Sequence, residues 1–587
     1  MDAVLGVERS VTGRRWRSRL ADARAGLALA QRLDVPEVVG RVLAARGVAA
    51  ADAEDFLNPS LRRSLPDPSR LVDMDAAIAR LVDAVKRGET VAVFGDYDVD
   101  GATSAALLKR YLVAVGAAAR VYVPDRLEEG YGPNAPALLR LQAEGAGVVI
   151  TVDCGIAAFA PLAEAAAAGL DVIVVDHHVA EARLPEAVAV VDPNRLDDDS
   201  GCGMLAAVGV AFLLVVGLNR ALRAADWFAA REEPDLRQWL DLVALGTVCD
   251  MVPLTGVNRA LVAQGLKVLA GRGNLGLATL VDVAGVRERP GTYHAAFILG
   301  PRVNAGGRIG RADLGATLLT TGDAGEAVAL AHRLDELNDE RRAIEAAVEA
   351  AAVRAVEASG DDAVAFAVGA GWHPGVVGIV ASRLVQRLNR PAFVIALADG
   401  VGKGSARTIP GVDVGAAVIA ARQTGLLIAG GGHAAAAGLT VAEERIGELR
   451  AFLVERLAAA VAEAGASPTL GLDGAIALGA ANCELVDLLD RVGPFGAGNA
   501  EPRFAVAASR VVRADVVGGR HVRCFLADDA GARLSAIAFR SVETPLGPAL
   551  LGAAGRALHV AGHLRADSWR GERRVQLLVD DVAPARA

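Results

Sequence analysis

Short apolar runs alternate with longer helix-like stretches through much of the chain, and several of the runs end in acidic residues. The run Val91–Gly95 continues into Asp96, Asp98 and Asp100, and a helix-like stretch follows from Gly101. Because an extended strand places alternate side chains on one face, we expect the three carboxylates to converge there. Gly101 would then allow a sharp turn into the helix. For this segment alone, an acidic turn with a capping aspartate is the alternative.

Three more apolar runs, each predicted to be a strand, end in carboxylate or imidazole side chains. These runs and the groups that follow them are Gly147–Val152 with Asp153, Asp171–Val175 with Asp176, His177 and His178, and Leu242–Val248 with Asp250. In an open parallel α/β sheet, ligands bind in a crevice at the carboxyl ends of the strands. Carboxylates gathered there suit divalent cations such as Mg²⁺ or Mn²⁺, which also offset the repulsion between them. The four strand ends therefore predict one shared metal-binding crevice.

The pattern of apolar positions changes along the chain and divides it into parts. After Gly310 the sequence is charged, rich in alanine and without proline, which predicts helices that end in a long one linking two lobes. Short β-rich runs at Arg503–Val512, His521–Leu526 and Val575–Val579 are typical of an oligonucleotide-binding (OB) barrel. The predicted parts are a helical lead-in at 1–75 with a turn at its ADAEDFLNP sequence, an α/β domain with a doubly wound parallel sheet at 76–310, connecting helices at 311–360, a smaller α/β domain at 361–460, and an OB barrel at 468–587.

Composition indicates a large multidomain protein. The chain has 587 residues, 53% of them hydrophobic but only 4% aromatic, so we expect cores built from Val, Leu and Ala. Cys154 and Cys249 have no CxxC spacing and are expected to pack as small buried residues rather than to bind zinc. The arginine-rich N-terminus lacks the apolar stretch of a secretory signal, and we find no uninterrupted apolar run of membrane-spanning quality. We therefore expect a cytoplasmic protein without a membrane partner.

Charge is distributed unevenly along the chain. The chain carries a net charge of −9, which is unusual for a protein that binds nucleic acid. Residues 501–587, however, contain 13 arginines, no lysine and nine acidic residues, so this part carries +4 and the remainder −13. Some of that negative charge belongs to the predicted metal site, where bound cations would offset it. The alternative for the basic C-terminal part is a solvated arginine-rich surface.

The order of four motifs, DxDxDG, VDCG, DHH and TVCDMVP, resembles the DHH phosphoesterases, and within them the single-strand-specific exonucleases of bacterial DNA repair and recombination. The resemblance covers nearly the whole chain. Its further motifs are GPRVNAGGRIG at 300–310, GWHPGVVGIVASRL at 371–384, GSART at 404–408, GGGHAAAAG at 430–438 and GPFGAGNAEP at 493–502. It implies two Mn²⁺ or Mg²⁺ ions and an OB barrel.

The acidic and imidazole groups can be assigned roles. We expect the metal ligands, and with them the catalytic centre, to be Asp98, Asp100, Asp153, Asp250 and the imidazole of His177. Asp96 and Asp176 are expected to be close neighbours or further ligands, and His178 to contact the scissile phosphate or hold a ligand in place. Such a centre could hydrolyse a phosphodiester without a protein nucleophile.

Arginine and glycine motifs supply candidate substrate contacts. Arg302, Asn304 and Arg308 are predicted to lie in a glycine-broken loop, where they could clamp phosphates or form a solvated loop. Ser405 and Arg407 are predicted to follow a strand and a glycine-lysine turn, and the resemblance implies a contact to the 5′-terminal or near-terminal phosphate there. The remaining candidates are the backbone N–H groups of Gly431 and Gly432 in a glycine-rich loop before His433, and His373 with Trp372, which could contact substrate or pack.

The resemblance implies a 5′→3′ exonuclease specific for single-stranded DNA that releases mononucleotides. Phe504, Phe525, Phe539 and Trp569 are candidate stackers in the barrel. A phosphodiesterase acting on short oligoribonucleotides or cyclic dinucleotides is one alternative, and a non-catalytic nucleic-acid-binding scaffold is another. Single-stranded DNA is the expected partner, a helicase and a single-strand-binding protein are candidate partners, and we expect a monomer.

Overall fold

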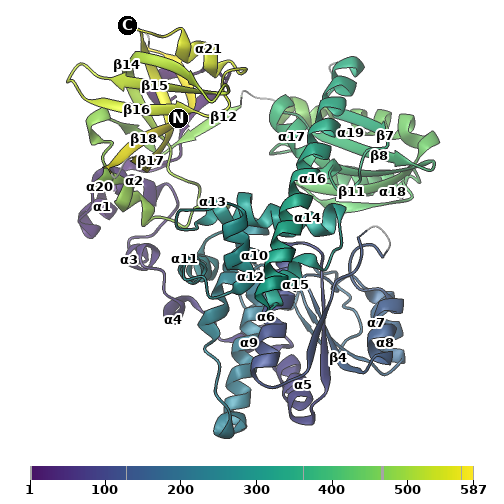
Figure 1. Ribbon diagram of the computed structural model, residues 1–587. Helices are drawn as coiled ribbons and strands as arrows, with labels where there is room; N and C mark the ends of the chain where they lie inside the picture. Colours follow the sequence, from purple (N-terminus) through teal and green to yellow (C-terminus); the bar gives the residue numbers. More distant parts are fainter. Residues whose placement is uncertain (1–2, 127–128, 361, 465–467, 570–571, 586–587) are drawn as a thin grey trace. The chain divides into compact units, whose positions relative to one another are not determined.

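The computed structural model describes residues 3–126, 129–360, 362–464, 468–569 and 572–585 (Figure 1). The chain divides into two units. The larger unit comprises Met1–Gly307, Arg311–Asp335 and Thr469–Ala587, and the smaller comprises Arg308–Gly310 and Glu336–Pro468.

A five-stranded parallel sheet forms the centre of the larger unit. Its strands, in spatial order, are β3 (Ala119–Tyr122), β2 (Thr90–Gly95), β4 (Ala146–Val152), β5 (Asp171–Val175) and β6 (Ala189–Val191). The strand order reverses between β2 and β4, which places a topological switch point at their carboxyl ends. The prediction of strands at Gly147–Val152 and Asp171–Val175 is confirmed.

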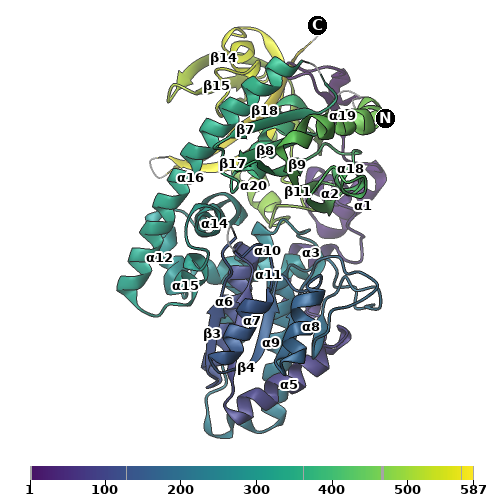
Figure 2. The same cartoon turned by 90° about the vertical axis from the view of Figure 1, so that its right-hand side faces the viewer.

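Both faces of this sheet are covered by helices. On β2, Val91 and Val93 pack with α5 (Met74–Arg87), α6 (Val99–Ala114) and α9 (Ala207–Ala224), whereas Ala92 and Phe94 pack with α7 (Ala135–Ala143) and α8 (Phe159–Ala167). Figure 1 shows α7 and α8 on the opposite side of β4 from α6 and α9, and Figure 2 gives the perpendicular view. The alternation of apolar side chains along one strand therefore builds two cores, and the predicted doubly wound domain is confirmed.

The prediction of a strand at Leu242–Val248 is wrong, because this run lies in helix α10 (Leu240–Cys249). Every residue from Leu240 to Val248 is buried, so the run shows neither the period of a strand nor that of an amphipathic helix. A short continuous apolar run cannot be assigned from periodicity alone. The helices that follow in this unit are α11 (Gly256–Ala270), α12 (Leu275–Val283), α13 (Thr292–His294), α14 (Gly300–Ile309) and α15 (Leu314–Thr320).

Helix α9 is long and apolar enough, by length and composition, to cross a membrane, in contrast to the expectation that no such run occurs. Of that stretch, 72% is buried inside the protein. Its residues pack with the sheet and with α5 and α6, as those of a central core helix do.

The C-terminal part of the larger unit is a closed barrel. Its elements are β14 (Phe504–Val517), β15 (His521–Ala527), β16 (Arg533–Ala538), α21 (Leu546–Leu551), β17 (Ala557–Trp569) and β18 (Glu572–Pro584). Strand β14 pairs with β15 on one side and with β17 on the other, which closes the sheet. The predicted OB barrel is confirmed, with the three β-rich runs falling on β14, β15 and β18.

The N-terminal segment packs against this barrel. Its elements are β1 (Arg15–Ser18), α1 (Ala23–Leu33), α2 (Glu37–Ala44), α3 (Ala53–Leu57) and α4 (Leu61–Ser64). Strand β1 pairs in parallel with β12 (Thr469–Leu472), and side chains of α1 and α2 share a core with β13 (Gly474–Ile476), α20 (Cys483–Asp490) and the barrel strands. The lead-in is therefore not wholly helical, and the turn predicted at ADAEDFLNP is the helix α3.

The smaller unit has a mixed five-stranded sheet in the order β10-β11-β9-β8-β7. Its elements are β7 (Ala365–Ala370), α17 (Val377–Leu388), β8 (Ala392–Ala398), β9 (Val401–Arg407), α18 (Val414–Gln423), β10 (Ala429–His433), β11 (Ala436–Ala442) and α19 (Ile446–Ala464). One face packs on α17 and the C-terminal part of α16 (Ala324–Ser359), the other on α18 and α19. The predicted long linking helix is α16.

A buried arginine fixes the barrel part to the α/β domain within the larger unit. Arg259 of α11 donates hydrogen bonds to the carbonyl oxygens of Phe56 (2.9 Å), Arg491 (3.3 Å) and Gly493 (2.6 Å). Its guanidinium carbon lies 3.7 Å from the centroid of the Phe56 ring. Burial lowers the pKa of Arg259 to about 10, which still leaves it charged at neutral pH.

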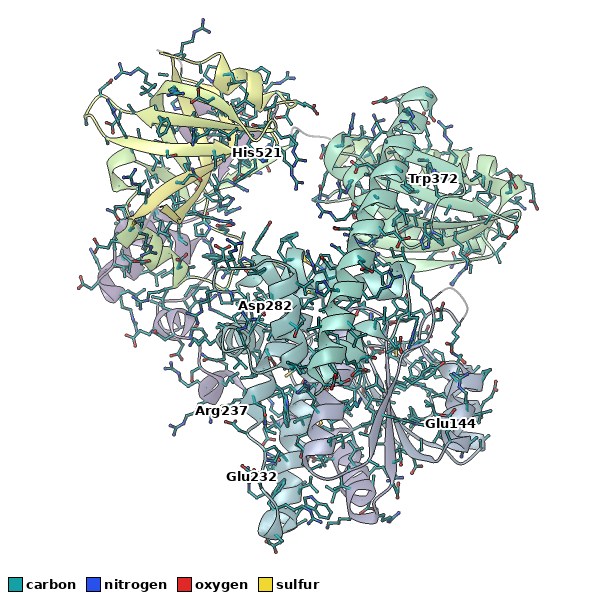
Figure 3. The ribbon with its side chains drawn as sticks, viewed as in Figure 1. Glu144, Glu232, Arg237, Asp282, Trp372 and His521 are labelled. Atoms are coloured by element: carbon teal, nitrogen blue, oxygen red, sulfur yellow. The ribbon has the colours of Figure 1, made fainter. Side chains whose placement is uncertain are left out.

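We predict that Arg259→Met destabilises the protein by about 2–4 kcal/mol, because three backbone carbonyl groups lose their buried donor. Thermal unfolding measures the change. The control is Arg272→Met, which removes an exposed arginine whose partner, Asp282, is labelled in Figure 3, and it should change the melting temperature little. Equal melting temperatures for the two variants would contradict the anchoring role.

Candidate metal centre

The last residues of β2, β4, β5 and β6 are in register across the sheet. Each of these strands is followed at once by an aspartate, and these are Asp96, Asp153, Asp176 and Asp192. The sequence analysis missed Asp192, because β6 has only three residues and its AVV run is too short to be recognised as a strand. The register places these four carboxylates along one edge of the sheet.

The DxDxDG segment does not stay extended as predicted. Strand β2 ends at Gly95, and Asp98 is the N-cap of α6, where its Oδ1 accepts the backbone N–H groups of Asp100 (2.8 Å) and Gly101 (3.1 Å). Asp100 therefore lies in the first turn of the helix, and the three aspartates do not share a strand face. Gly101 serves close packing rather than a turn, since a Cβ atom there would lie 2.5 Å from the carbonyl oxygen of Asp96.

Asp100 is buried and accepts hydrogen bonds from a second helix. Its two carboxylate oxygens accept the backbone N–H groups of Ala207 (2.6 Å) and Val208 (3.0 Å) at the start of α9. The positive end of a helix stabilises a carboxylate at this position. Burial, followed by the charge of Asp250, nevertheless raises the pKa of Asp100 to about 7.

His177 lies among carboxylates from three elements. Its Nε2 is 3.2 Å from an oxygen of Asp153 and 3.9 Å from an oxygen of Asp100, and its Nδ1 is 3.7 Å from an oxygen of Asp250. Asp250 follows α10 as its C-cap, so a helix and not a strand delivers this carboxylate. The side-chain amide of Asn194 donates to the carbonyl oxygen of His177 (2.5 Å) and fixes the backbone there. Asn194 is a second residue that the sequence analysis missed.

The donor atoms form adjoining groups. Within each group, one atom from every residue lies within 4.8 Å of the others, and the groups are Asp96, Asp98 and Asp153; Asp100, His177 and Asp250; and Asp153, His177 and His178. Asp153 and His177 each belong to two groups, so the groups form one continuous cluster. The structure thus brings together all the predicted ligands except Asp176.

The donor set fits divalent cations. Among the described residues, Asp96 Oδ1, His177 Nε2 and Asp250 Oδ2 are buried atoms of this cluster without a hydrogen-bond partner. Unpaired buried polar atoms are costly, and here they belong to one cluster of donors. Burial and then the charge of Asp98 raise the pKa of Asp96, and burial raises that of Asp250 to about 7. Carboxylate oxygens with an imidazole nitrogen are the ligands that Mn²⁺ accepts, and Mg²⁺ accepts the oxygens.

Asp176 and His178 are bonded differently from the rest of the cluster. Both oxygens of Asp176 are occupied. Oδ2 accepts the N–H of Ile156, and Oδ1 accepts the N–H groups of His177 and His178 and lies 2.7 Å from Nδ1 of His178. Burial alone would raise the pKa of Asp176, but the bond with His178 and the backbone N–H groups hold it below its ordinary value. Burial alone would lower the pKa of His178, but this bond together with the charges of the surrounding aspartates raises it to about 9.

The prediction that Arg302, Asn304 and Arg308 lie in a loop is wrong, since residues 300–309 form α14. Arg302 donates to Asp335 (2.8 Å) and to the carbonyl oxygen of Ile298 (2.7 Å), which ties α14 to α16. A Cβ atom on Gly307 would lie 2.6 Å from the carbonyl oxygen of Tyr97, so the glycines permit close helix packing beside the DxDxDG segment. Arg308, in the smaller unit, donates to the carbonyl oxygen of Gly375 (3.0 Å).

Ser405 and Arg407 lie within strand β9, not after a turn as predicted. The hydroxyl of Ser405 accepts a hydrogen bond from Arg407 Nη1 (2.9 Å). A Cβ atom on Gly378, in the first turn of α17, would lie 3.1 Å from Ser405 Oγ and 3.2 Å from Arg407 Nη2. The hydroxyl and the guanidinium therefore face the N-terminal end of α17, a position that favours an anion.

The predicted glycine loop before His433 is also wrong, because Gly430 to His433 belong to β10. This strand is at the edge of the sheet and pairs only with β11, so its outer backbone groups are not used by the ladder. His373 Nδ1 accepts the N–H of Gly375 (3.0 Å). Trp372, labelled in Figure 3, packs on the core of its own unit.

The barrel aromatics divide by exposure. Phe504 is fully buried, so the prediction that it stacks on bases is wrong, whereas Phe525 and Phe539 are 39% and 59% exposed. The side chain of Trp569 lies outside the described residues. Cys154 is buried and Cys249 half-buried, both as free thiols, and burial raises the pKa of each.

Three family descriptions match the chain. The DHH family N-terminal domain matches residues 90–247, the DHHA1 domain matches residues 361–459, and the RecJ OB domain matches residues 472–581. They coincide with the parallel-sheet domain, the sheet of the smaller unit and the barrel.

Similar proteins extend over nearly the full length. The single-stranded-DNA-specific exonuclease RecJ of Salmonella typhimurium is 36% identical, covering 97% of this chain and 99% of the relative. That of Escherichia coli is 35% identical, covering 94% and 96%. The crystal structure of Thermus thermophilus RecJ in complex with Mn²⁺ has a TM-score of 0.80 at 29% identity, covering 97% of this chain and 80% of that one. The chain therefore belongs to the RecJ family, whose relatives carry the name single-stranded-DNA-specific exonuclease.

Proposed function

We propose that this protein is a metal-dependent exonuclease that degrades single-stranded DNA from the 5′ end and releases mononucleotides. The observation that carries the proposal is the continuous cluster of acidic and imidazole donors, in which buried atoms of Asp96, His177 and Asp250 have no hydrogen-bond partner. The names of the relatives and the RecJ structures containing Mn²⁺ or Mg²⁺ support it.

The cluster provides positions for two divalent cations. One would be held by Asp96, Asp98 and Asp153, the other by Asp100, His177 and Asp250, with Asp153 and His177 between the two positions. Two such cations, when bound, supply Lewis acidity that activates water for attack on phosphorus and stabilises the leaving oxygen. The register of β2, β4 and β5 and the caps of α6 and α10 hold the donors in place before any cation binds.

His178 is assigned to the substrate phosphate. In the metal-free protein its pKa is raised to about 9, and the carboxylate of Asp176 favours the protonated imidazole. With Nδ1 held by Asp176, the remaining ring N–H at Nε2 can donate to a phosphate oxygen. Asp176 then acts by orienting His178 rather than as a metal ligand, which revises the role predicted from the sequence.

The preference for a 5′ end is assigned to the smaller unit. Ser405, Arg407 and the N-terminal end of α17 together offer a hydroxyl, a guanidinium and backbone N–H groups to a terminal phosphate. Gly431, Gly432 and His433 on the edge strand are further candidate contacts, as are Arg308 and His373 of the same unit. Asn304 of α14 in the larger unit is another. The exposed Phe525 and Phe539 of the barrel are assigned to stacking on the strand.

The barrel favours this function over the alternatives. A phosphodiesterase of short oligoribonucleotides or cyclic dinucleotides has no use for a separate strand-binding barrel, and a non-catalytic scaffold has no use for a complete donor cluster. We also infer that the protein acts as a monomer in the cytoplasm, and that a helicase and a single-strand-binding protein supply its DNA in repair and recombination.

The proposal is tested with Asp98→Asn on a 5′-phosphorylated single strand in Mn²⁺. Asparagine caps a helix as well as aspartate does, so α6 is retained while the carboxylate is lost. Hydrolysis should fall on the order of 10²–10³-fold or more, with strand binding largely intact. Asp83→Asn, an exposed aspartate on α5, is the matched control.

The wild-type time course should show metal-dependent loss from the 5′ end of the DNA, no loss in EDTA, and little loss from a duplex or an RNA of the same sequence. Unchanged hydrolysis by Asp98→Asn would remove the metal assignment. Preference for the RNA would instead favour the phosphodiesterase.

Asp176→Asn separates an orienting role from a ligand role. We expect kcat to fall roughly 10- to 100-fold, because His178 loses its charged partner, while the Mn²⁺ concentration needed for half-maximal activity changes little. Metal titrations of activity measure both quantities. A weakening of Mn²⁺ binding as large as that in Asp98→Asn would return Asp176 to the ligands.

The stability of the metal-free protein should fall as the pH rises. The folded-state pKa values of Asp100 and Asp250 are about 7, above the ordinary 3.8, so ionising these groups near pH 7 costs folding free energy that is absent below about pH 4. The rise in melting temperature on adding Mn²⁺ should therefore be larger at pH 8 than at pH 6.

Differential scanning fluorimetry of EDTA-stripped protein measures this effect. Asp250→Asn should melt higher than the wild type at pH 8 without metal and should lose most of the Mn²⁺ effect. An Mn²⁺ effect that is smaller at pH 8 than at pH 6 would contradict the role of buried carboxylates.

A further inference from the structure

The segment 202–206, which leads into α9, connects the elements that carry one group of metal donors. The donors of this group are Asp100, His177 and Asp250. Asp100 accepts the first two backbone N–H groups of α9, at 2.6 and 3.0 Å. The carboxylate of Asp100 is therefore fixed by the helix that follows directly on this segment.

The second donor of the group is connected to the segment by Asn194. The side-chain amide of Asn194 donates to the carbonyl oxygen of His177 (2.5 Å) and to that of Gly203 (3.3 Å). The first bond holds the backbone that carries the imidazole, and the second joins this backbone to the segment. His177, which follows β5, and Asp100, which lies in α6, therefore share one support.

The third donor is connected to the segment by Asn258, a fully buried residue in the first turn of α11. Its Nδ2 donates to the carbonyl oxygen of Met204 (2.6 Å) and to that of Pro253 (3.0 Å). Pro253 lies in the loop between α10 and α11, shortly after Asp250. One amide therefore joins the loop that follows Asp250 to the segment that supports the other two donors.

The surroundings of Asn258 do not otherwise favour an amide. Its neighbours on α11, Val257, Ala260 and Leu261, are buried apolar residues, and among the described residues its Oδ1 atom has no hydrogen-bond partner. A buried amide with an unpaired oxygen costs folding free energy, and asparagine is not a favoured residue within a helix. Packing and helix formation therefore do not explain asparagine at this position, whereas its two donated bonds do.

We propose that Asn258 is a positioning residue for the metal position to which Asp100, His177 and Asp250 belong. The inference rests on the proposed function and deepens it. By joining the loop after Asp250 to the segment before α9, Asn258 keeps the carboxylate of Asp250 within reach of a cation held by the other two donors. Groups that hold metal ligands in place from outside the coordination shell contribute strongly to metal affinity.

The test is the binding of Mn²⁺ to metal-free Asn258→Ala, measured by isothermal titration calorimetry. We expect Mn²⁺ to bind one of its two positions roughly 10- to 100-fold more weakly than in the wild type, with the other position unchanged. The control is Leu269→Ala, which truncates a buried side chain at the other end of α11. It should lower the melting temperature and leave both binding constants unchanged. Asn258→Ser keeps a shorter donor, should show a smaller loss, and replaces the alanine variant if that variant does not fold.

Combination with ligand variants identifies the metal position that Asn258 serves. In the Asp98→Asn background, which alters the other position, Asn258→Ala should weaken Mn²⁺ binding by the same factor as in the wild type. In the Asp250→Asn background it should add little, because the ligand that Asn258 positions is already lost. In hydrolysis of single-stranded DNA, excess Mn²⁺ should restore kcat of Asn258→Ala, with KM for the DNA unchanged.

Unchanged Mn²⁺ binding by Asn258→Ala together with a lowered melting temperature, as in Leu269→Ala, would overturn the proposal and leave Asn258 a purely structural residue. An equal loss in the Asp250→Asn background would overturn it as well, because the amide would then act on a group other than Asp250. Failure of the proposed function is recognised separately, because the wild type would then bind Mn²⁺ without cleaving single-stranded DNA.

Discussion

The main physical constraint on this protein is the mutual repulsion of the carboxylates that the parallel sheet brings together. The register of β2, β4, β5 and β6 aligns four strand ends, and an aspartate follows each of them. Asp98, Asp100 and Asp250 come from helix ends at the same crevice. Burial raises the pKa of several of these groups, so ionising them in the folded chain without metal costs free energy. Divalent cations remove this penalty, and a site built in this way is prepared for binding before any cation arrives.

The N-terminal ends of three helices lie against charged or polar side chains. Asp98 caps α6, Asp100 accepts the first N–H groups of α9, and Ser405 with Arg407 faces the start of α17. In the first two cases the helix end stabilises a carboxylate of the protein, and in the third it faces a hydroxyl and a guanidinium, a combination that suits an anion from outside. One physical device therefore serves both the metal cluster and the proposed phosphate contact.

The segment after α20 connects the barrel part of the protein to the metal cluster. Arg259 ties α11 to the 491–493 backbone, and the loop that follows packs on the segment after Asp250. The segment that Arg259 fixes therefore also contacts the loop that carries a proposed metal ligand. This connection gives the GPFGAGNAEP motif a physical role that its composition alone did not indicate.

The sequence by itself determined the parallel-sheet domain, the barrel, the linking helix and nearly all of the acidic cluster, because strand periodicity and the residues after each strand are local features. Only the tertiary structure decided that Leu242–Val248 and residues 300–309 are helices, and that the glycines before His433 form an edge strand. A run buried on all sides has no readable period, and glycines that permit close packing look the same in sequence as glycines of a loop. Asp192 and Asn194 were missed for a related reason. Their roles depend on neighbours that are distant in the sequence, and only folding brings these together.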